Sequence, residues 1–193
     1  MKAYLEKSEY IDWDDAAILK LADTLSKDKN DELEVVNNCF EWVRDNIKHS
    51  WDYKMNPVTC KASDVLKHGT GYCYAKSHLL AALLRANNIP AGLCYQRLSI
   101  NEDGAPYCLH GLNAVYLKEH GWYRLDARGN KEGVNAQFTP PYEQLAFPVV
   151  DANEKDFSEI WPAPVEAIVT VLTENKTVED VLNNLPDIEV VSV

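Results

Sequence analysis

The sequence predicts an α+β fold, with N-terminal helices packed on an antiparallel β-sheet. Up to about residue 90, apolar residues recur at the spacings of helices that pack on a core. After Pro90 the pattern changes to short strand-like runs separated by turns. Helices followed by a meander differ from the strand–helix alternation that predicts a parallel sheet. A chain of 193 residues, 46% of them hydrophobic, can bury one sizeable core, so we expect a single domain over residues 1–193.

The composition argues against several classes of partner. The formal net charge of -11 repels phosphate backbones, so we expect no nucleic-acid partner. No apolar run approaches the roughly 20 residues that cross a bilayer, so we expect no membrane partner. The first residues, "MKAYLEKSEYIDWDD", contain no apolar region of the kind found in signal peptides, which favours a cytoplasmic location. Neither the oligomeric state nor the substrate is indicated by composition, because net charge is a weak guide to both.

Acidic residues precede the first two predicted helices. Asp14 and Asp15 come directly before "AAILKLADTL", and Asn30 and Asp31 come before a longer helix. Asp and Asn side chains cap helix N-termini, and acids complement the positive end of the helix dipole. The core-facing stripe of the longer helix consists of Leu33, Val36, Phe40, Val43 and Ile47.

The segment "KHSWDYKMNPVTCKA" loses the helical spacing, and we interpret it as a loop. Ser63 is expected to cap a short helix, "DVLKH", and Gly69 to end it. A longer helix is predicted from about Cys73 to "NNIP", where proline disfavours helical geometry in the preceding residue.

Three strands and two turns follow this helix. The strands are "AGLCYQRLSI", "CLHGLNAVYL" and "GWYRLDA", and the turns are "NEDGAP" and "KEHG". The remaining residues, 131–193, are punctuated by proline and are expected to form a C-terminal extension that wraps the core. Within it, "TVEDVLNNL" is predicted to be a helix capped by Thr177.

Cys73 lies at the predicted start of a helix, between two tyrosines and after two glycines. A disulfide is disfavoured because the five cysteines cannot all pair within one chain, and none needs to pair in a reducing compartment. A metal site is disfavoured because no ligand set with familiar spacing completes Cys108-x-His110. A helix N-terminus stabilises a thiolate, and its free N–H groups can accept an oxyanion. Taken alone, Cys73 is therefore a candidate nucleophile or a buried small apolar residue.

A nucleophilic cysteine requires a base and a group that orients the base. His110 is the histidine inside an apolar strand pattern, whereas His49, His68 and His120 lie in loops or at a helix end, where solvated roles are expected. His78 lies one turn beyond Cys73, where it either lines the helix or approaches the site.

Asp126 is the candidate orienting acid, at the end of "GWYRLD". A hairpin with Lys118 opposite Trp122 and Gly121 in the left-handed position puts His110 and Asp126 on the same face of the sheet. In that register Asp126 lies opposite Ala114, so direct contact with His110 requires a bulge or a tighter register.

Several separated segments together resemble the transglutaminase-like superfamily of papain-like cysteine enzymes. They are "DVLKHGTGYCYAKS", "LLRANNIPAGL", "CLHGLNAVYL" and "GWYRLDARGN", and the resemblance covers about residues 33–130. It implies a papain-like core in which Cys73 is the nucleophile, His110 the general base and acid, and Asp126 the residue that orients the imidazole.

The resemblance also implies an oxyanion hole made of the cysteine's own N–H and a donor from an upstream loop. Trp51 and Tyr53 are candidates for that donor, although aromatic packing is the simpler explanation of both. Tyr72 and Tyr74 flank the cysteine and are candidate cleft residues. The chain departs from many members at Leu112, where they have an aromatic residue, and at Tyr74, where small residues are common. Both departures are expected to reshape the cleft.

The resemblance implies an acyl-transfer enzyme that acts on amide bonds through a thioester, without a metal or cofactor. We expect a cysteine peptidase or amidase whose partner is a peptide or small amide. The alternatives are a protein-glutamine transamidase and a catalytically silent peptide-binding module of the same fold. An acetyltransferase of small amines would need an acyl-CoA site, for which the sequence carries no signal.

Overall fold

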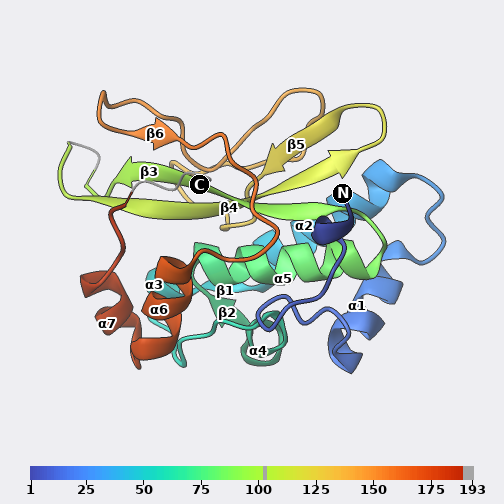
Figure 1. Ribbon diagram of the computed structural model, residues 1–193, viewed down its shortest axis with the longest axis horizontal. Coiled ribbons are helices and arrows are strands. Elements are labelled where there is room, and N and C mark those ends of the chain that lie inside the picture. The colour runs from blue at the N-terminus through green and yellow to red at the C-terminus, as the bar shows by residue number, and fades with distance from the viewer. Residues whose placement is uncertain (102–103, 189–193) are drawn as a thin grey trace.

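The computed structural model describes residues 1–101 and 104–188, which form a sheet with a layer of helices on one face (Figure 1). The sheet is four-stranded and antiparallel, in the order β5-β4-β3-β6. Its strands are β3 (Ala91–Ser99), β4 (Tyr107–Leu117), β5 (Gly121–Leu125) and β6 (Lys155–Asp156). The main helices are α1 (Ala16–Ser26), α2 (Glu32–Asn46), α4 (Ala62–His68) and α5 (Cys73–Ala86). The prediction of an α+β fold is confirmed.

Helix α5 lies at the centre of the helical layer. Its residues Cys73–Arg85 are all buried, because α1, α2 and α4 pack around it and β3 and β4 cover it from the sheet side. Even its buried cations have backbone partners. Lys76 donates hydrogen bonds to the carbonyls of Arg44 and Ile47, where α2 ends. The lysine therefore caps α2 and fixes α5 against it.

The capping signals in the sequence hold at several helix ends. Asp15 caps α1 and Asp31 caps α2, each by accepting hydrogen bonds from backbone N–H groups of the first turn. Gly69 ends α4 with a φ of 66°, in the left-handed region that glycine tolerates. The prediction for Ser63 is wrong, because α4 begins at Ala62, two residues before the predicted start, and the Ser63 hydroxyl donates a hydrogen bond to Asp12 Oδ2 at 2.5 Å.

The segment interpreted as a loop contains two short elements. β1 (Lys48–His49) pairs in parallel with β2 (Thr70–Gly71), and α3 (Ser50–Tyr53) follows β1 directly. The pairing joins residues more than twenty positions apart, so the local pattern carries no sign of it. It brings the beginning of α3 beside the residues that lead into α5.

The β4–β5 hairpin is tighter than the sequence analysis predicts. Lys118 belongs to the turn, and Leu117 already pairs with Gly121, whose φ is 71°. The shift keeps the predicted face of each residue but moves Asp126 two positions closer to His110 along the partner strand. The hairpin therefore forms in the tighter register and not in the one that pairs Lys118 with Trp122.

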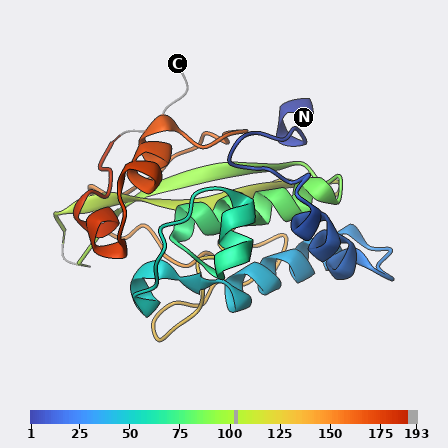
Figure 2. The same cartoon turned by 90° about the horizontal axis from the view of Figure 1, so that it is seen from below.

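The segment after residue 130 returns to the sheet and to the helices. β6 pairs with β3, and Trp161 forms a further bridge to Leu93. Helices α6 (Glu166–Glu174) and α7 (Val178–Asn183) lie at the opposite end of the helical layer from α1 (Figure 2). Thr177 caps α7 as predicted, with a complete capping box. Beyond α7, the Pro186 carbonyl accepts a hydrogen bond of 2.8 Å from the N–H of Leu109, on the half of β4 that β5 does not cover.

Candidate active site

Cys73 is the first residue of α5, as predicted, and it is 7% exposed. Tyr72 precedes the helix in an extended conformation, so the chain turns sharply from β2 into α5. Gly71 is needed here for space: a Cβ would lie 3.1 Å from Ala75 Cβ and 3.3 Å from Thr59 Oγ1. The close packing of β2 on α5 holds the thiol at the helix N-terminus, where free N–H groups and the helix dipole favour negative charge.

His110 on β4 joins the thiol to a carboxylate. Its Nε2 lies 2.7 Å from Asp126 Oδ2, and both side chains are buried. Because Nε2 bonds Asp126, Nδ1 is the nitrogen available to the Cys73 thiol, with which His110 also hydrogen-bonds. Burial alone would lower the pKa of His110, but the charges and hydrogen bonds of Asp126 and Cys73 outweigh it and raise that pKa to about 10. The imidazole is therefore held ready to carry a proton.

The carboxylate of Asp126 is fixed by the chain that follows it. Its Oδ1 accepts the N–H of Arg128 at 3.1 Å, and its Oδ2 accepts the N–H of Ala146 at 3.2 Å. Burial would raise the pKa of Asp126, but the charge of His110 and these hydrogen bonds lower it. Phe147 packs edge-on against the His110 ring, with centroids 5.2 Å apart. The sequence analysis missed Ala146 and Phe147, since nothing in "PPYEQLAFP" indicates contact with a residue twenty positions earlier.

The residues after the cysteine and after the histidine hold the two elements together. The N–H of Gly111 points at the Cys73 sulfur, 3.4 Å away. Tyr74 is buried and its hydroxyl donates a hydrogen bond to the Leu109 carbonyl. β4 is thus fixed to the first turn of α5 on both sides of His110, which sets the separation of thiol and imidazole.

A family model for the transglutaminase-like superfamily matches residues 19–127. The chain belongs to this superfamily. Cys73, His110 and Asp126 all lie inside the matched region. The superfamily includes cysteine proteases and transglutaminases, which agrees with the resemblance found in the sequence.

Solved structures with a similar fold include two bacterial proteins. A candidate cysteine protease from Cytophaga hutchinsonii is 25% identical, with a TM-score of 0.51 over 65% of this chain and 40% of that one. The periplasmic domain of TgpA from Pseudomonas aeruginosa is 20% identical, with a TM-score of 0.48 over 64% of this chain and 45% of that one. This transglutaminase-like chain thus spans less than half the length of either. No curated protein matches it.

The four tyrosine and tryptophan candidates have different surroundings. Tyr72 is buried, and its hydroxyl donates a 2.6 Å hydrogen bond to the Val178 carbonyl at the start of α7. Tyr74 lies under β4, as described above, and acts as a spacer between α5 and the sheet. Trp51 packs partly against the core, while Tyr53 is 57% exposed, and a lysine ammonium lies over each ring. Their proposed part in an oxyanion hole stays a prediction.

His49 is the site residue that the sequence analysis misplaced. His49 was expected to be solvated in a loop. It is buried instead, because β1 pairs with β2 and places His49 beside Gly71. Its ring packs edge-on against Tyr72, with centroids 5.5 Å apart, and its Nδ1 lies 3.7 Å from Asp52 Oδ2. Among the described residues this Nδ1 has no hydrogen-bond partner. Burial lowers the pKa of His49 well below its usual value, with a contribution from the charge of Arg128, so the ring is neutral at pH 7.

His78 does not approach the site. Its Nδ1 lies 2.7 Å from the Cys60 carbonyl, and burial lowers its pKa to about 4. It is a neutral core histidine. The four other thiols are also unsuited to attack at neutral pH, because burial raises the pKa of each to about 12: Cys39, Cys60, Cys94 and Cys108.

In residues 1–101 and 104–188, no group of three or more His, Cys, Asp or Glu side chains could hold a metal ion. Over the same ranges, no helix is long and apolar enough to cross a bilayer.

Proposed function

We propose that this transglutaminase-like chain is a cysteine hydrolase that cleaves amide bonds through a thioester on Cys73. The observation that carries the proposal is the chain of contacts from thiol to imidazole to carboxylate, with His110 Nε2 2.7 Å from Asp126 Oδ2. A nucleophile, a base and a group that orients the base are the parts that such chemistry needs.

The first half of the reaction forms the acyl-enzyme. His110 Nδ1 takes the proton of the Cys73 thiol, and the thiolate attacks the amide carbonyl carbon. The carbonyl oxygen becomes an oxyanion, which the free N–H groups at the beginning of α5 stabilise. When the C–N bond breaks, protonated His110 gives its proton to the departing amine. Asp126 keeps the imidazole oriented throughout and stabilises its positive charge.

The second half releases the acyl group. His110 takes a proton from water as the water oxygen attacks the thioester carbonyl, the C–S bond breaks, and His110 returns the proton to the Cys73 sulfur. The products are a carboxylic acid and the regenerated Cys73 thiol. The Cytophaga hutchinsonii neighbour, described as a candidate cysteine protease, favours water as the acceptor. A transglutaminase would use a primary amine instead of water in this half.

A peptide substrate is supported by the edge of β4. The half of this strand that carries His110 lacks a β5 partner, and its Leu109 N–H donates a hydrogen bond to the Pro186 carbonyl. This edge already accepts a main-chain contact from the chain's own C-terminal segment, and a peptide substrate would add a strand here by displacing that segment. The substrate main chain would then pass directly beside Cys73.

The experiment compares Cys73→Ala with Cys60→Ala on a library of peptide amides. Cys73→Ala should abolish product formation, and Cys60→Ala should retain it, since the Cys60 thiol is buried beside His78. Intact-mass spectrometry after acid quenching should detect an acyl adduct on Cys73 of the wild type. Product containing an added amine in place of water would indicate the transglutaminase. Full turnover by Cys73→Ala would disprove the proposal, and the absence of turnover and of any adduct in the wild type would favour a silent binding module.

A further inference from the structure

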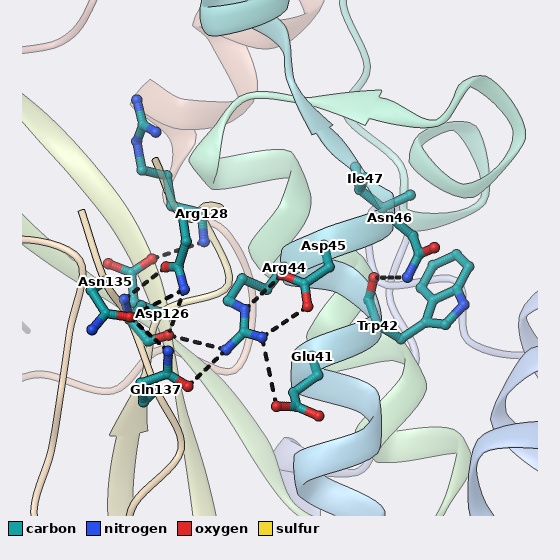
Figure 3. A network of polar contacts seen from close by, with 12 residues as sticks. Glu41, Trp42, Arg44, Asp45, Asn46, Ile47, Asp126, Arg128, Asn135 and Gln137 are labelled. Atoms are coloured by element: carbon teal, nitrogen blue, oxygen red, sulfur yellow. Dashed lines mark hydrogen bonds and ion pairs between the residues drawn. The ribbon is translucent and has the colours of Figure 1, made fainter. Parts of the chain in front are cut away.

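A pocket of about 430 Å³ is lined by His49 and Arg128, two residues that contact neighbours of the candidate active site. It lies between the end of α2, the β1–α3 segment and the residues that follow Asp126. Figure 3 shows Arg44 on α2 reaching toward Gln137, in the segment that follows Asp126 and Arg128, while Asp45 pairs with the Arg44 guanidinium. The pocket is thus formed by three parts of the chain that are distant in sequence.

The pocket is positively charged although the chain is acidic. Four cationic and two acidic side chains line it, which leaves two positive charges in excess, whereas the whole chain has a formal charge of -11. The charged residues are Arg44, Asp45, Lys48, Asp52, Arg128 and Lys131. A concave site focuses the field of such an excess, so the pocket attracts anions that the rest of the surface repels.

Two contacts connect the pocket to the reacting groups. On the cysteine side, His49 lines the pocket and packs on Tyr72, the residue before Cys73. On the carboxylate side, Arg128 donates its N–H to Asp126, and its guanidinium lies over the Phe147 ring, 5.4 Å from the centroid. The pocket is therefore one residue removed from the cysteine segment on one side and from Asp126 on the other.

The donors in the pocket are only partly used. Asp52 is the shared partner of Arg128, at 2.6 and 3.1 Å, and of Lys131, at 2.9 Å. Burial would raise the pKa of Asp52, but the hydrogen bonds from these two cations lower it to about 2, so one carboxylate balances two cations. Lys131 is 48% exposed, and an ammonium has three N–H donors. His49 adds a buried neutral ring whose Nδ1 has no hydrogen-bond partner among the described residues.

We propose that this pocket binds a carboxylate of the amide substrate, within two residues of the bond that is cleaved. Lys131 supplies the main charge, and His49 donates a hydrogen bond from its ring. The inference rests on the proposed function and adds the substrate class, acidic peptides or acidic amides. It also explains why Arg128 and Lys131 follow so closely after Asp126: one loop fixes the orienting acid and carries the cations that recognise the substrate.

The test measures binding to Cys73→Ala, so that it does not depend on turnover. The probes are acetyl-tetra-alanine amides in which each position in turn carries Glu, Gln or Lys, titrated by calorimetry. We expect the Glu peptide at one position to bind at least ten times more tightly than its Gln partner, and the Lys peptide to bind most weakly. Raising the salt concentration should reduce the Glu preference.

Lys131→Gln in the same background should reduce the Glu-to-Gln affinity ratio several-fold. The matched control is Lys20→Gln, since Lys20 is an exposed lysine on α1, away from the pocket, and should leave the ratio unchanged. Equal binding of Glu and Gln peptides at every position, or a ratio unaffected by Lys131→Gln, would overturn the inference. A clear Glu preference combined with no turnover by the wild type would instead contradict the proposed hydrolase and leave the carboxylate pocket standing.

Discussion

Gly111 packs directly against Tyr74: a Cβ at residue 111 would lie 2.8 Å from Tyr74 Cδ1 and 3.2 Å from Tyr74 Cα. These residues follow His110 and Cys73 in the chain, so their contact fixes the distance between base and nucleophile. A glycine is required here for the close approach of two backbones rather than for a turn.

Gly111→Ala should therefore move β4 away from α5. We expect kcat/KM to fall at least tenfold, and the free energy of unfolding to fall by about 1–3 kcal/mol, the usual cost of overpacking a core. Peptide hydrolysis and urea unfolding measure the two effects. Tyr116→Phe, on the exposed face of the same strand, is the control and should change neither. An alanine variant with wild-type activity would show that the contact does not set the geometry.

Asp126→Asn should preserve the shape of the site and remove its charge. The pKa of His110 is raised by the Asp126 charge against the effect of burial, so it should fall in the variant. The alkaline limb of the kcat/KM profile should then shift to lower pH, and the maximal rate should drop about 10²- to 10⁴-fold. Asp23→Asn, at an exposed position on α1, controls for the loss of a negative charge. An unshifted pH profile would contradict the orienting role of Asp126.

Lys76 should make stability increase with pH above neutrality. Burial and the nearby Arg128 charge lower its pKa to about 7, from 10.5 in the unfolded chain. Between pH 7 and 10.5 Lys76 is protonated in the unfolded state and neutral in the folded state. The free energy of unfolding of the wild type should therefore rise by about 1 kcal/mol per pH unit relative to Lys76→Met. Urea unfolding of both proteins at pH 7.5 and 9.0 measures the difference. A constant difference across this range would mean that Lys76 stays charged in the folded protein.

His78 should make the protein less stable as the pH falls below neutrality. Its pKa is lowered by burial to about 4, against 6.5 in the unfolded chain, so the folded state resists protonation. The contribution of neutral His78 to the free energy of unfolding is complete above pH 6.5. It is lost as the pH falls toward 4, by about 1 kcal/mol per pH unit. His78→Gln retains a side-chain donor for the Cys60 carbonyl and should flatten this dependence. Unfolding curves of both proteins at pH 7.0, 6.0 and 5.0 measure the difference. If both proteins lost the same free energy of unfolding over this range, the prediction would be refuted.

The helix starts were predictable because their signals are local. Asp15, Asp31 and Thr177 each accept a hydrogen bond from an N–H two or three residues ahead, so the sequence alone contains both partners. The position of Cys73 at the beginning of α5 was predicted from the two glycines before it and the apolar run after it, since Tyr72 gives this helix no side-chain cap. The shared face of His110 and Asp126 was also predictable, since side chains alternate along a strand whatever its exact register.

The sequence by itself determined the fold class, the superfamily and the three residues that approach one another. Only the tertiary structure decided that Leu117 pairs with Gly121, that Ala146 holds Asp126, and that His49 lies buried beside Tyr72. Each of these contacts joins segments whose approach depends on how helices and sheet pack, and local spacing does not encode that. The charged pocket beside the site belongs to the same class, because it exists only where α2, α3 and the loop after β5 meet.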